Sequence, residues 1–247
     1  MGLTAPYRRT VRPFVNGGYH SDSMCFVRAT GYAESPRSYI RPFLYLQREI
    51  RSLYEYIEPS DNHLATYSDS VGKLLVSACF EVESNLKAIF RENGYGTRDL
   101  TMSQYRRLEV SHRLSEYEVL IPEWVEGDKI VRPFSAWHST GSLPWYQGYN
   151  SYKHDRATNA SAANFGALIE AWTGLFALLT SQFYKEDFSV DEQIVGWSHE
   201  SQPNEFQHGI GGYLKFRAPG SWNEEEKYDF PLADLFRGKI VFENISV

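Results

Sequence analysis

The segment spanning residues 162–184 constrains the fold more than any other part of the chain. Placed on a helix, it is apolar on nearly every side, and its only charged residue is Glu170. A membrane span needs about 18 or more consecutive apolar residues, whereas Asn164, Thr173 and the Thr-Ser-Gln run at 180–182 interrupt this segment. We therefore expect a helix at the centre of a bundle, buried on several sides, and no membrane span.

A second segment, residues 68–92, has the clearest helical pattern in the chain. Its apolar residues advance by 4, 3, 4 and 3 positions, which places them in one stripe: Leu75, Cys79, Val82, Leu86 and Ile89. Such a stripe is typical of the seam of a helical bundle. The Asn93-Gly94 pair that follows suits the left-handed residue that ends many helices.

Three further segments have helical spacing. Residues 39–57 form an amphipathic pattern that Pro59 closes. Residues 101–114 predict a shorter helix with Thr101 as its N-cap. Residues 145–156 follow Pro144, which suits the first turn of a helix. Ser161 is the expected N-cap of the central helix.

The remaining segments look extended or irregular. Strand-like runs occur in the N-terminal arm at residues 7–15 and 24–29, and in a loop-rich insertion at 118–121 and 129–131. After residue 188 the chain is rich in Gly, Pro and aromatic residues, with strand-like runs at 213–217 and 239–245.

These patterns predict a mainly α protein in three parts. Residues 1–60 are an Arg-rich arm and the first helix, residues 61–187 are the helical-bundle core, and residues 188–247 are a β-rich C-terminal cap packed on the bundle. Aromatic residues make up 15% of the chain, a share that excludes extensive disorder.

The charge is unevenly distributed. The chain has a net charge of −6, which disfavours a protein that coats DNA non-specifically, but residues 1–51 hold eight arginines and three acidic residues. Two interpretations of this arm stay open: it pairs with the acidic body of the protein or of a partner, or it contacts RNA.

The sequence lacks the usual cofactor and metal motifs. Cys25 and Cys79 form neither a disulfide framework nor a metal pattern, and Glu109 and His112 form a single Glu-x-x-His pair where a dinuclear bundle site needs two. Walker and dinucleotide phosphate loops are absent. We expect no cofactor and no metal, and, because no apolar leader is visible, a cytoplasmic location.

Residues 145–156 carry the most chemistry. On a helix Asn150, Lys153 and His154 share one face, and Asp155 and Arg156 follow at its C-terminal end. A histidine can transfer protons near neutral pH while neighbouring cations hold a phosphate. The alternative is a plain helix end, with cations near the last carbonyls and with Trp145, Tyr149 and Tyr152 as core anchors.

A second candidate lies on the 68–92 helix. Glu81 and Asn85 are four residues apart and could border a polar pocket in the bundle. Glu83 can pair with Lys87, and the simplest interpretation places it on a solvated face.

The chain resembles an uncharacterised bacterial family associated with the HEPN superfamily (higher eukaryotes and prokaryotes nucleotide-binding). The resemblance covers about residues 40–188 and is carried by these segments: Tyr-Ile-Glu-Pro at 56–59, Cys-Phe-Glu-Val-Glu-Ser-Asn-Leu-Lys at 79–87, Tyr-Glu-Val-Leu-Ile-Pro at 117–122, Pro-Phe-Ser-Ala-Trp at 133–137, and Tyr-Asn-Ser-Tyr-Lys-His-Asp-Arg at 149–156.

The resemblance implies a HEPN-like helical bundle. Many members of the superfamily are metal-independent endoribonucleases, often toxins or phage-defence effectors. Their motif is Arg, a polar residue and then His four to six residues from the Arg. Two copies form one RNA cleft, in which the His aids attack by the 2′-hydroxyl and the Arg holds the phosphate.

The resemblance assigns roles to residues of this sequence. His154 matches the motif His and Asn150 the polar residue, as catalytic and orienting groups, while Tyr149 stands where the Arg is expected and Arg156 can replace that cation. Lys153, Asp155 and Tyr149 would line the substrate, with Glu81 and Asn85 as a further border. Arg106 and Arg107 with His112, and Arg132 with His138, match the spacing at about the frequency expected by chance.

Three hypotheses follow. The protein is a metal-independent ribonuclease, or it is a non-catalytic bundle that binds a partner protein, a nucleotide or RNA, or residues 153–156 only fasten the cap to the bundle. The expected partners are RNA, a second copy of the chain and a cognate partner protein.

Overall fold

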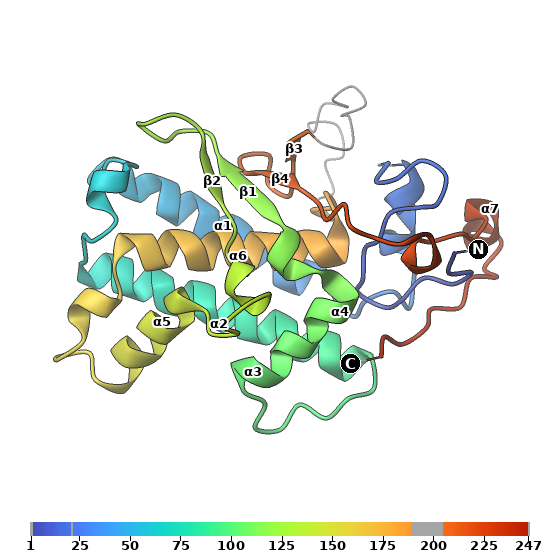
Figure 1. The fold of residues 1–247 in the computed structure, drawn as a ribbon, viewed down its shortest axis with the longest axis horizontal. Helices are drawn as coiled ribbons and strands as arrows, with labels where there is room; N and C mark the ends of the chain where they lie inside the picture. The colour runs from blue at the N-terminus through green and yellow to red at the C-terminus, as the bar shows by residue number, and fades with distance from the viewer. Residues whose placement is uncertain (1, 21, 189–204, 247) are drawn as a thin grey trace.

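The computed structural model describes residues 2–20, 22–188 and 205–246. The protein is mainly α, as predicted, and four longer helices form its body: α1 (Arg37–Leu53), α2 (Asp69–Glu92), α5 (Pro144–His154) and α6 (Phe165–Phe183). Helix α6 packs against the other three, with α1 and α5 on different sides of it (Figure 1).

Helix α6 is the central helix that its composition predicts. Every residue from Ala171 to Phe183 is buried, because neighbouring elements cover it on all sides. Its N-cap is Asn164, whose side chain accepts a hydrogen bond from the Ala167 N–H at 2.9 Å. The prediction of Ser161 as the cap is wrong, because Ser161 lies in a short 3-10 turn, Ala160–Ala162. Among the described residues, no helix is both long and apolar enough to cross a membrane.

Helix α2 buries the predicted stripe. Leu75, Cys79, Val82, Leu86 and Ile89 are all fully buried. The Ser68 hydroxyl caps the helix by accepting from the Val71 N–H at 3.2 Å. At Gly72 the ring of Tyr152 from α5 lies so close that a Cβ would stand 2.5 Å from its hydroxyl oxygen. A glycine therefore permits the close approach of α5 to α2.

The predicted helix at 101–114 is broken into short pieces. These are α3 (Met102–Tyr105), a 3-10 turn (Arg106–Leu108) and α4 (Glu109–His112), after which Arg113 turns left-handed with φ 48°. Thr101 begins the first piece in a capping box with Gln104. A last short helix, α7, spans Leu232–Phe236.

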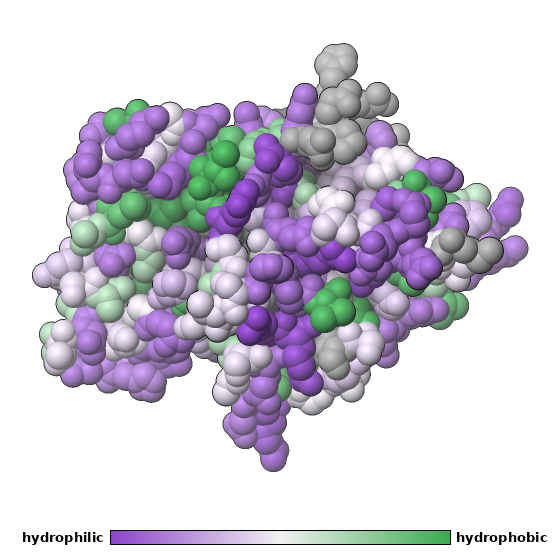
Figure 2. Space-filling model, in the orientation of Figure 1, coloured by the Kyte–Doolittle hydropathy of each residue, from purple (hydrophilic) through white to green (hydrophobic). Residues whose placement is uncertain are grey.

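A small antiparallel sheet covers one side of the bundle. The strands β1 (Glu118–Ile121), β2 (Lys129–Val131), β3 (Gln207–His208) and β4 (Lys215–Arg217) lie in the order β2-β1-β4-β3. Both strands predicted in the insertion are confirmed, and Val119 pairs with Val131 on one side and Phe216 on the other. Figure 2 shows that this face is largely hydrophilic, with an elongated apolar patch beside the β1–β2 hairpin.

The prediction of a β-rich C-terminal cap is only partly right. In the described part of residues 188–247 the strands are β3 and β4, which complete a sheet begun by β1 and β2. The run at 239–245 forms no strand, because its main chain meets the arm at one isolated bridge, Tyr7 to Glu243. Residues 189–204 of the predicted cap lie outside the described residues.

The predicted strands of the N-terminal arm are wrong. Residues 24–28 lie in a 3-10 helix, Asp22–Arg28, in which Phe26 and Val27 are both buried. The run at 7–15 turns at residues 8–9, where Arg9 has φ 52°, and makes only isolated bridges among the described residues.

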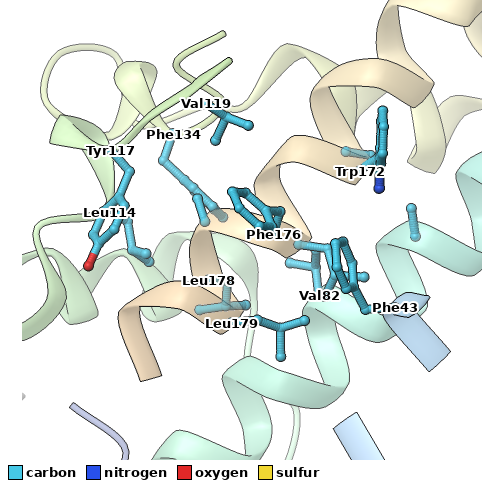
Figure 3. Packing of buried hydrophobic residues seen from close by; sticks show 14 of the residues in the cluster. Phe43, Val82, Leu114, Tyr117, Val119, Phe134, Trp172, Phe176, Leu178 and Leu179 are labelled. Carbon is cyan, nitrogen blue, oxygen red and sulfur yellow. The ribbon is translucent and has the colours of Figure 1, made fainter. Parts of the chain in front are cut away.

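One hydrophobic cluster joins the arm, the bundle and the sheet. Figure 3 shows its centre, where side chains of α6 meet those of α1, α2 and β1: Trp172, Phe176 and Leu179 with Phe43, Val82 and Val119. The bundle and its coverings therefore share a core, which gives α5 a rigid base.

Candidate functional site

Helix α5 is anchored through its aromatic face. Trp145, Tyr149 and Tyr152 are buried, as the core-anchor interpretation predicts, and the Trp145 indole donates to the Pro133 carbonyl at 2.8 Å. Tyr152 packs on Gly72 of α2. These contacts hold α5 between α2 and α6 and turn its polar face outward.

The outward end of α5 carries the predicted chemistry. His154 is the last residue of the helix, and its side chain, like those of Lys153 and Arg156, is exposed, while Asn150 is half-buried. In the described part of the chain, neither His154 nor Arg156 has an ion pair or a side-chain hydrogen bond. An accessible imidazole thus stands within two residues of two cations.

Lys153 and Tyr149 interact along the helix. The Lys153 ammonium lies 5.3 Å from the centre of the Tyr149 ring, and a hydrogen bond with the phenol raises the pKa of Lys153. Burial raises the pKa of Tyr149, so that both groups are protonated at neutral pH. Tyr149 therefore supports Lys153 and supplies no cation of its own.

Asp155 shapes the turn that follows the helix. Its side chain accepts from the Thr158 N–H at 3.2 Å, and its carbonyl accepts from the Asn159 N–H at 3.0 Å. Hydrogen bonds from Thr158 hold the pKa of the Asp155 carboxyl below its usual value. The carboxylate is thus engaged in the turn that presents Arg156.

Glu81 and Asn85 do not belong to this site, which corrects the prediction that they border it. Asn85 is fully buried, donates to the Glu81 carbonyl at 2.9 Å and accepts from Gln182 of α6 at 3.4 Å. Glu83 faces α5, and residues two apart on a helix point about 200° apart, so Glu81 faces away from α5. Partial burial raises the pKa of Glu81.

Glu83 and Tyr146 are a pair that the sequence interpretation missed. The Tyr146 hydroxyl donates to the Glu83 carboxylate at 3.0 Å, and the Lys87 ammonium lies 3.9 Å from the other oxygen. The Glu83 side chain is 21% exposed, so the solvated face predicted for it is only partly right. Tyr146 and Glu83 have no periodic relation in the sequence, since they meet through the packing of α5 on α2.

The buried hydroxyl of Tyr105 lies in the same region. Burial and the Glu83 charge raise the pKa of Tyr105 to about 12. Burial is also the main cause of the raised pKa of Tyr146. Both phenols therefore stay protonated at neutral pH, and Tyr146 ties α5 to α2 as a hydrogen-bond donor to Glu83.

The other histidines with motif spacing lie in different surroundings. His112 is 1% exposed, with Nε2 3.0 Å from the Arg9 carbonyl and Nδ1 2.8 Å from the Ser111 hydroxyl. Burial lowers the pKa of His112 to about 4. It is therefore neutral and closed to a substrate, whereas His138 is exposed.

The Glu109–His112 pair is not a metal site either. The Glu109 carboxylate accepts from the N–H of Ser115 at 3.1 Å and from its hydroxyl, while His112 faces Arg9. Within the described ranges, no cluster of three or more His, Cys, Asp or Glu side chains has the arrangement to hold a metal ion.

Comparisons of the chain with protein-family models, with curated proteins and with solved structures find no match.

Proposed function

We propose that this protein cleaves RNA without a metal ion, at the surface formed by Asn150, Lys153, His154 and Arg156. The observation that carries the proposal is the accessible imidazole of His154 at the end of α5, beside the exposed cations of Lys153 and Arg156. A mainly α bundle agrees with the HEPN-like fold that the sequence resemblance implies.

Metal-independent RNA cleavage needs a proton acceptor and positively charged side chains around the phosphate. Neutral His154 accepts the proton of a ribose 2′-hydroxyl, whose oxygen attacks the adjacent phosphorus. Lys153 and Arg156 stabilise the charge that develops on the non-bridging phosphate oxygens, and the Asn150 amide orients the substrate. The 5′-oxygen leaves with a proton, so the products are a 2′,3′-cyclic phosphate and a 5′-hydroxyl.

A second copy of the chain supplies the missing acid. Each α5 end offers one imidazole, and the reaction uses one neutral imidazole as a base and one imidazolium as an acid. We propose that two copies meet so that both His154 side chains face one phosphate. This arrangement corresponds to the homodimer that the resemblance implies.

The test is cleavage of RNA in EDTA by the purified protein. His154→Ala should lower the rate by about 100-fold or more, the usual contribution of a general acid or base. His138→Ala is the matched control, because His138 is also exposed and, unlike His154, follows an arginine, Arg132, at motif spacing. No cleavage by the wild type, or an equal loss in both variants, rejects the proposal.

A second function is favoured by one observation. Tyr149 occupies the position where the superfamily motif has its arginine, and its ring is buried in the bundle. A site without that arginine can bind a partner protein, a nucleotide or RNA without cleaving it. Binding of RNA that His154→Ala weakens, with no cleavage by the wild type, supports this function over the first.

A further inference from the structure

The arginines of residues 1–51 divide into two groups in the structure. Five have partners within the protein. Arg9 pairs with Glu92 at 2.7 Å, and Arg28 pairs with Glu186. The guanidinium groups of Arg8 and Arg12 donate hydrogen bonds to backbone carbonyls. Arg51 forms an ion pair with Glu123, with 3.4 Å between its Nη2 and the carboxylate oxygen.

The second group lies on helix α1. Arg37, Arg41 and Arg48 are exposed, and none of them has an ion pair or a hydrogen bond in the described part of the chain. Helix α1 contains four arginines and a single acidic residue, Glu49. A positive surface therefore remains on a protein whose net charge is −6.

These arginines share one helix face with an exposed aromatic ring. Arg37, Arg41, Tyr45 and Arg48 advance by 4, 4 and 3 residues, which places them within a narrow arc opposite the buried residues of α1. We call these four residues the α1 stripe. From Arg37 to Arg48 the stripe is about 16 Å long at 1.5 Å per residue.

Aromatic side chains are interleaved with the positive charge. Tyr45 is 53% exposed, and the Arg48 guanidinium carbon lies 5.4 Å from the centre of its ring. Tyr56, just beyond the helix end, is 83% exposed. At the other end an open groove is lined by residues that include Ser35, Ser38 and Phe188.

This combination fits a single-stranded nucleic acid better than other anions. Unpaired bases stack on exposed aromatic rings while cations follow the backbone, and arginine guanidinium groups both stack and bind phosphate in a bidentate manner. An acidic peptide has phosphate-like charge but no base to stack on Tyr45. We infer that the α1 stripe binds single-stranded RNA, an inference that rests on the proposed function only for the choice of RNA.

The α1 stripe and the α5 site are separate. Helices α1 and α5 lie on different sides of α6 (Figure 1). A short oligonucleotide on the stripe therefore leaves the end of α5 uncovered, and binding and cleavage can be measured independently.

The binding test uses a fluorescein-labelled 12-nucleotide U oligomer and His154→Ala protein, so that no cleavage occurs during the titration. Anisotropy is measured between 50 and 200 mM NaCl. Each phosphate neutralised on a single strand contributes a slope of about −0.7 to the plot of log K against log salt. Three arginine contacts contribute about −2 to the slope, and R37Q/R41Q/R48Q should remove that contribution and weaken binding.

Two controls separate the stripe from total charge and from surface disruption. R98Q/R107Q/R237Q removes the same charge from exposed arginines outside α1 and should keep the slope of the parent protein. Tyr45→Ala should weaken binding about 5-fold or more through lost stacking, whereas Tyr45→Phe, which keeps the ring, should bind as tightly as the parent.

The outcomes distinguish this inference from the proposed function. Unchanged binding by R37Q/R41Q/R48Q, or equal weakening by both triple variants, overturns the inference whatever the cleavage assay shows. Stripe-dependent binding without cleavage supports the inference and rejects the nuclease. If a polyglutamate peptide binds the stripe more tightly than the U oligomer, the ligand is an acidic protein segment and the RNA inference is overturned.

Discussion

At the scale of single residues, His112 links stability to pH. Its Nε2 lies 3.0 Å from the Arg9 carbonyl, which can only accept, so Nε2 carries the proton and the Ser111 hydroxyl donates to Nδ1. Burial lowers its pKa from 6.5 to about 4. The folded state therefore binds fewer protons than the unfolded state between these pH values.

The sign of the pH effect follows from that difference. His112 contributes stability above pH 6.5, and this contribution is lost as the pH falls toward 4, by about 3 kcal/mol in total. His112→Gln should flatten this part of the curve, measured by urea unfolding at several pH values from 7 to 4. His138→Gln, at an exposed position, is the control for the loss of a histidine, and an equal slope in wild type and His112→Gln contradicts the assignment.

At the scale of elements, the contact of α5 with α2 depends on Gly72. A Cβ there would lie 2.5 Å from the Tyr152 hydroxyl oxygen, so Gly72→Ala must displace Tyr152 or α5. Overpacking of this kind costs about 1–3 kcal/mol, which for a chain of this size lowers Tm by about 2–12 °C. A thermal melt checks this, with Gly96→Ala as the control, since a Cβ at Gly96 meets nothing within 4 Å.

The Gly72 experiment also reports on the candidate site. Because Tyr152 is two residues before His154, its displacement should lower RNA cleavage more than Gly96→Ala does. A Gly72→Ala protein with the melting temperature of the wild type contradicts the close packing of α5 on α2.

Elements with strong local signals were predictable from the sequence. The stripe of α2, Pro144 at the head of α5 and both strands of the β1–β2 hairpin lie where the patterns place them. Each of these depends on a short-range relation, such as helical spacing or a capping side chain.

Side-chain directions and hydrogen bonds that depend on contacts between distant segments were not predictable from the sequence. The direction of Asn85 is decided by Gln182, nearly a hundred residues later, and the Glu83–Tyr146 bond by the packing of α5 on α2. Residues 24–29 have strand-like composition, yet the structure has a 3-10 helix at Asp22–Arg28, whose Phe26 and Val27 pack into the core. The exposure of His154 was predictable, because His154 lies at the polar end of an amphipathic helix.

At the scale of the whole molecule, Arg9 ties the N-terminal arm to the bundle. Its guanidinium is completely buried, pairs with Glu92 of α2 at 2.7 Å and donates to Gln182 of α6 at 2.7 Å. The ring of Tyr39 lies 4.4 Å from the same group. The arm is therefore part of the folded unit.

Removal of one partner of this ion pair should destabilise the whole protein. Arg9→Met leaves the Glu92 carboxylate buried with only the more distant cation of Arg91, at 3.5 Å, and removal of one partner of a buried ion pair costs about 3–5 kcal/mol. In the double variant R9M/E92Q the charge is gone, so the loss should be smaller than in R9M, as chemical denaturation can measure. Equal stability of R9M and the wild type contradicts the role of Arg9.

The most direct test of the central claim is identification of the RNA ends produced in EDTA. The account predicts a 2′,3′-cyclic phosphate and a 5′-hydroxyl, produced by the wild type and His138→Ala and lost in His154→Ala. Products with a 5′-phosphate and a 3′-hydroxyl, or the same products in undiminished yield from His154→Ala, would contradict it.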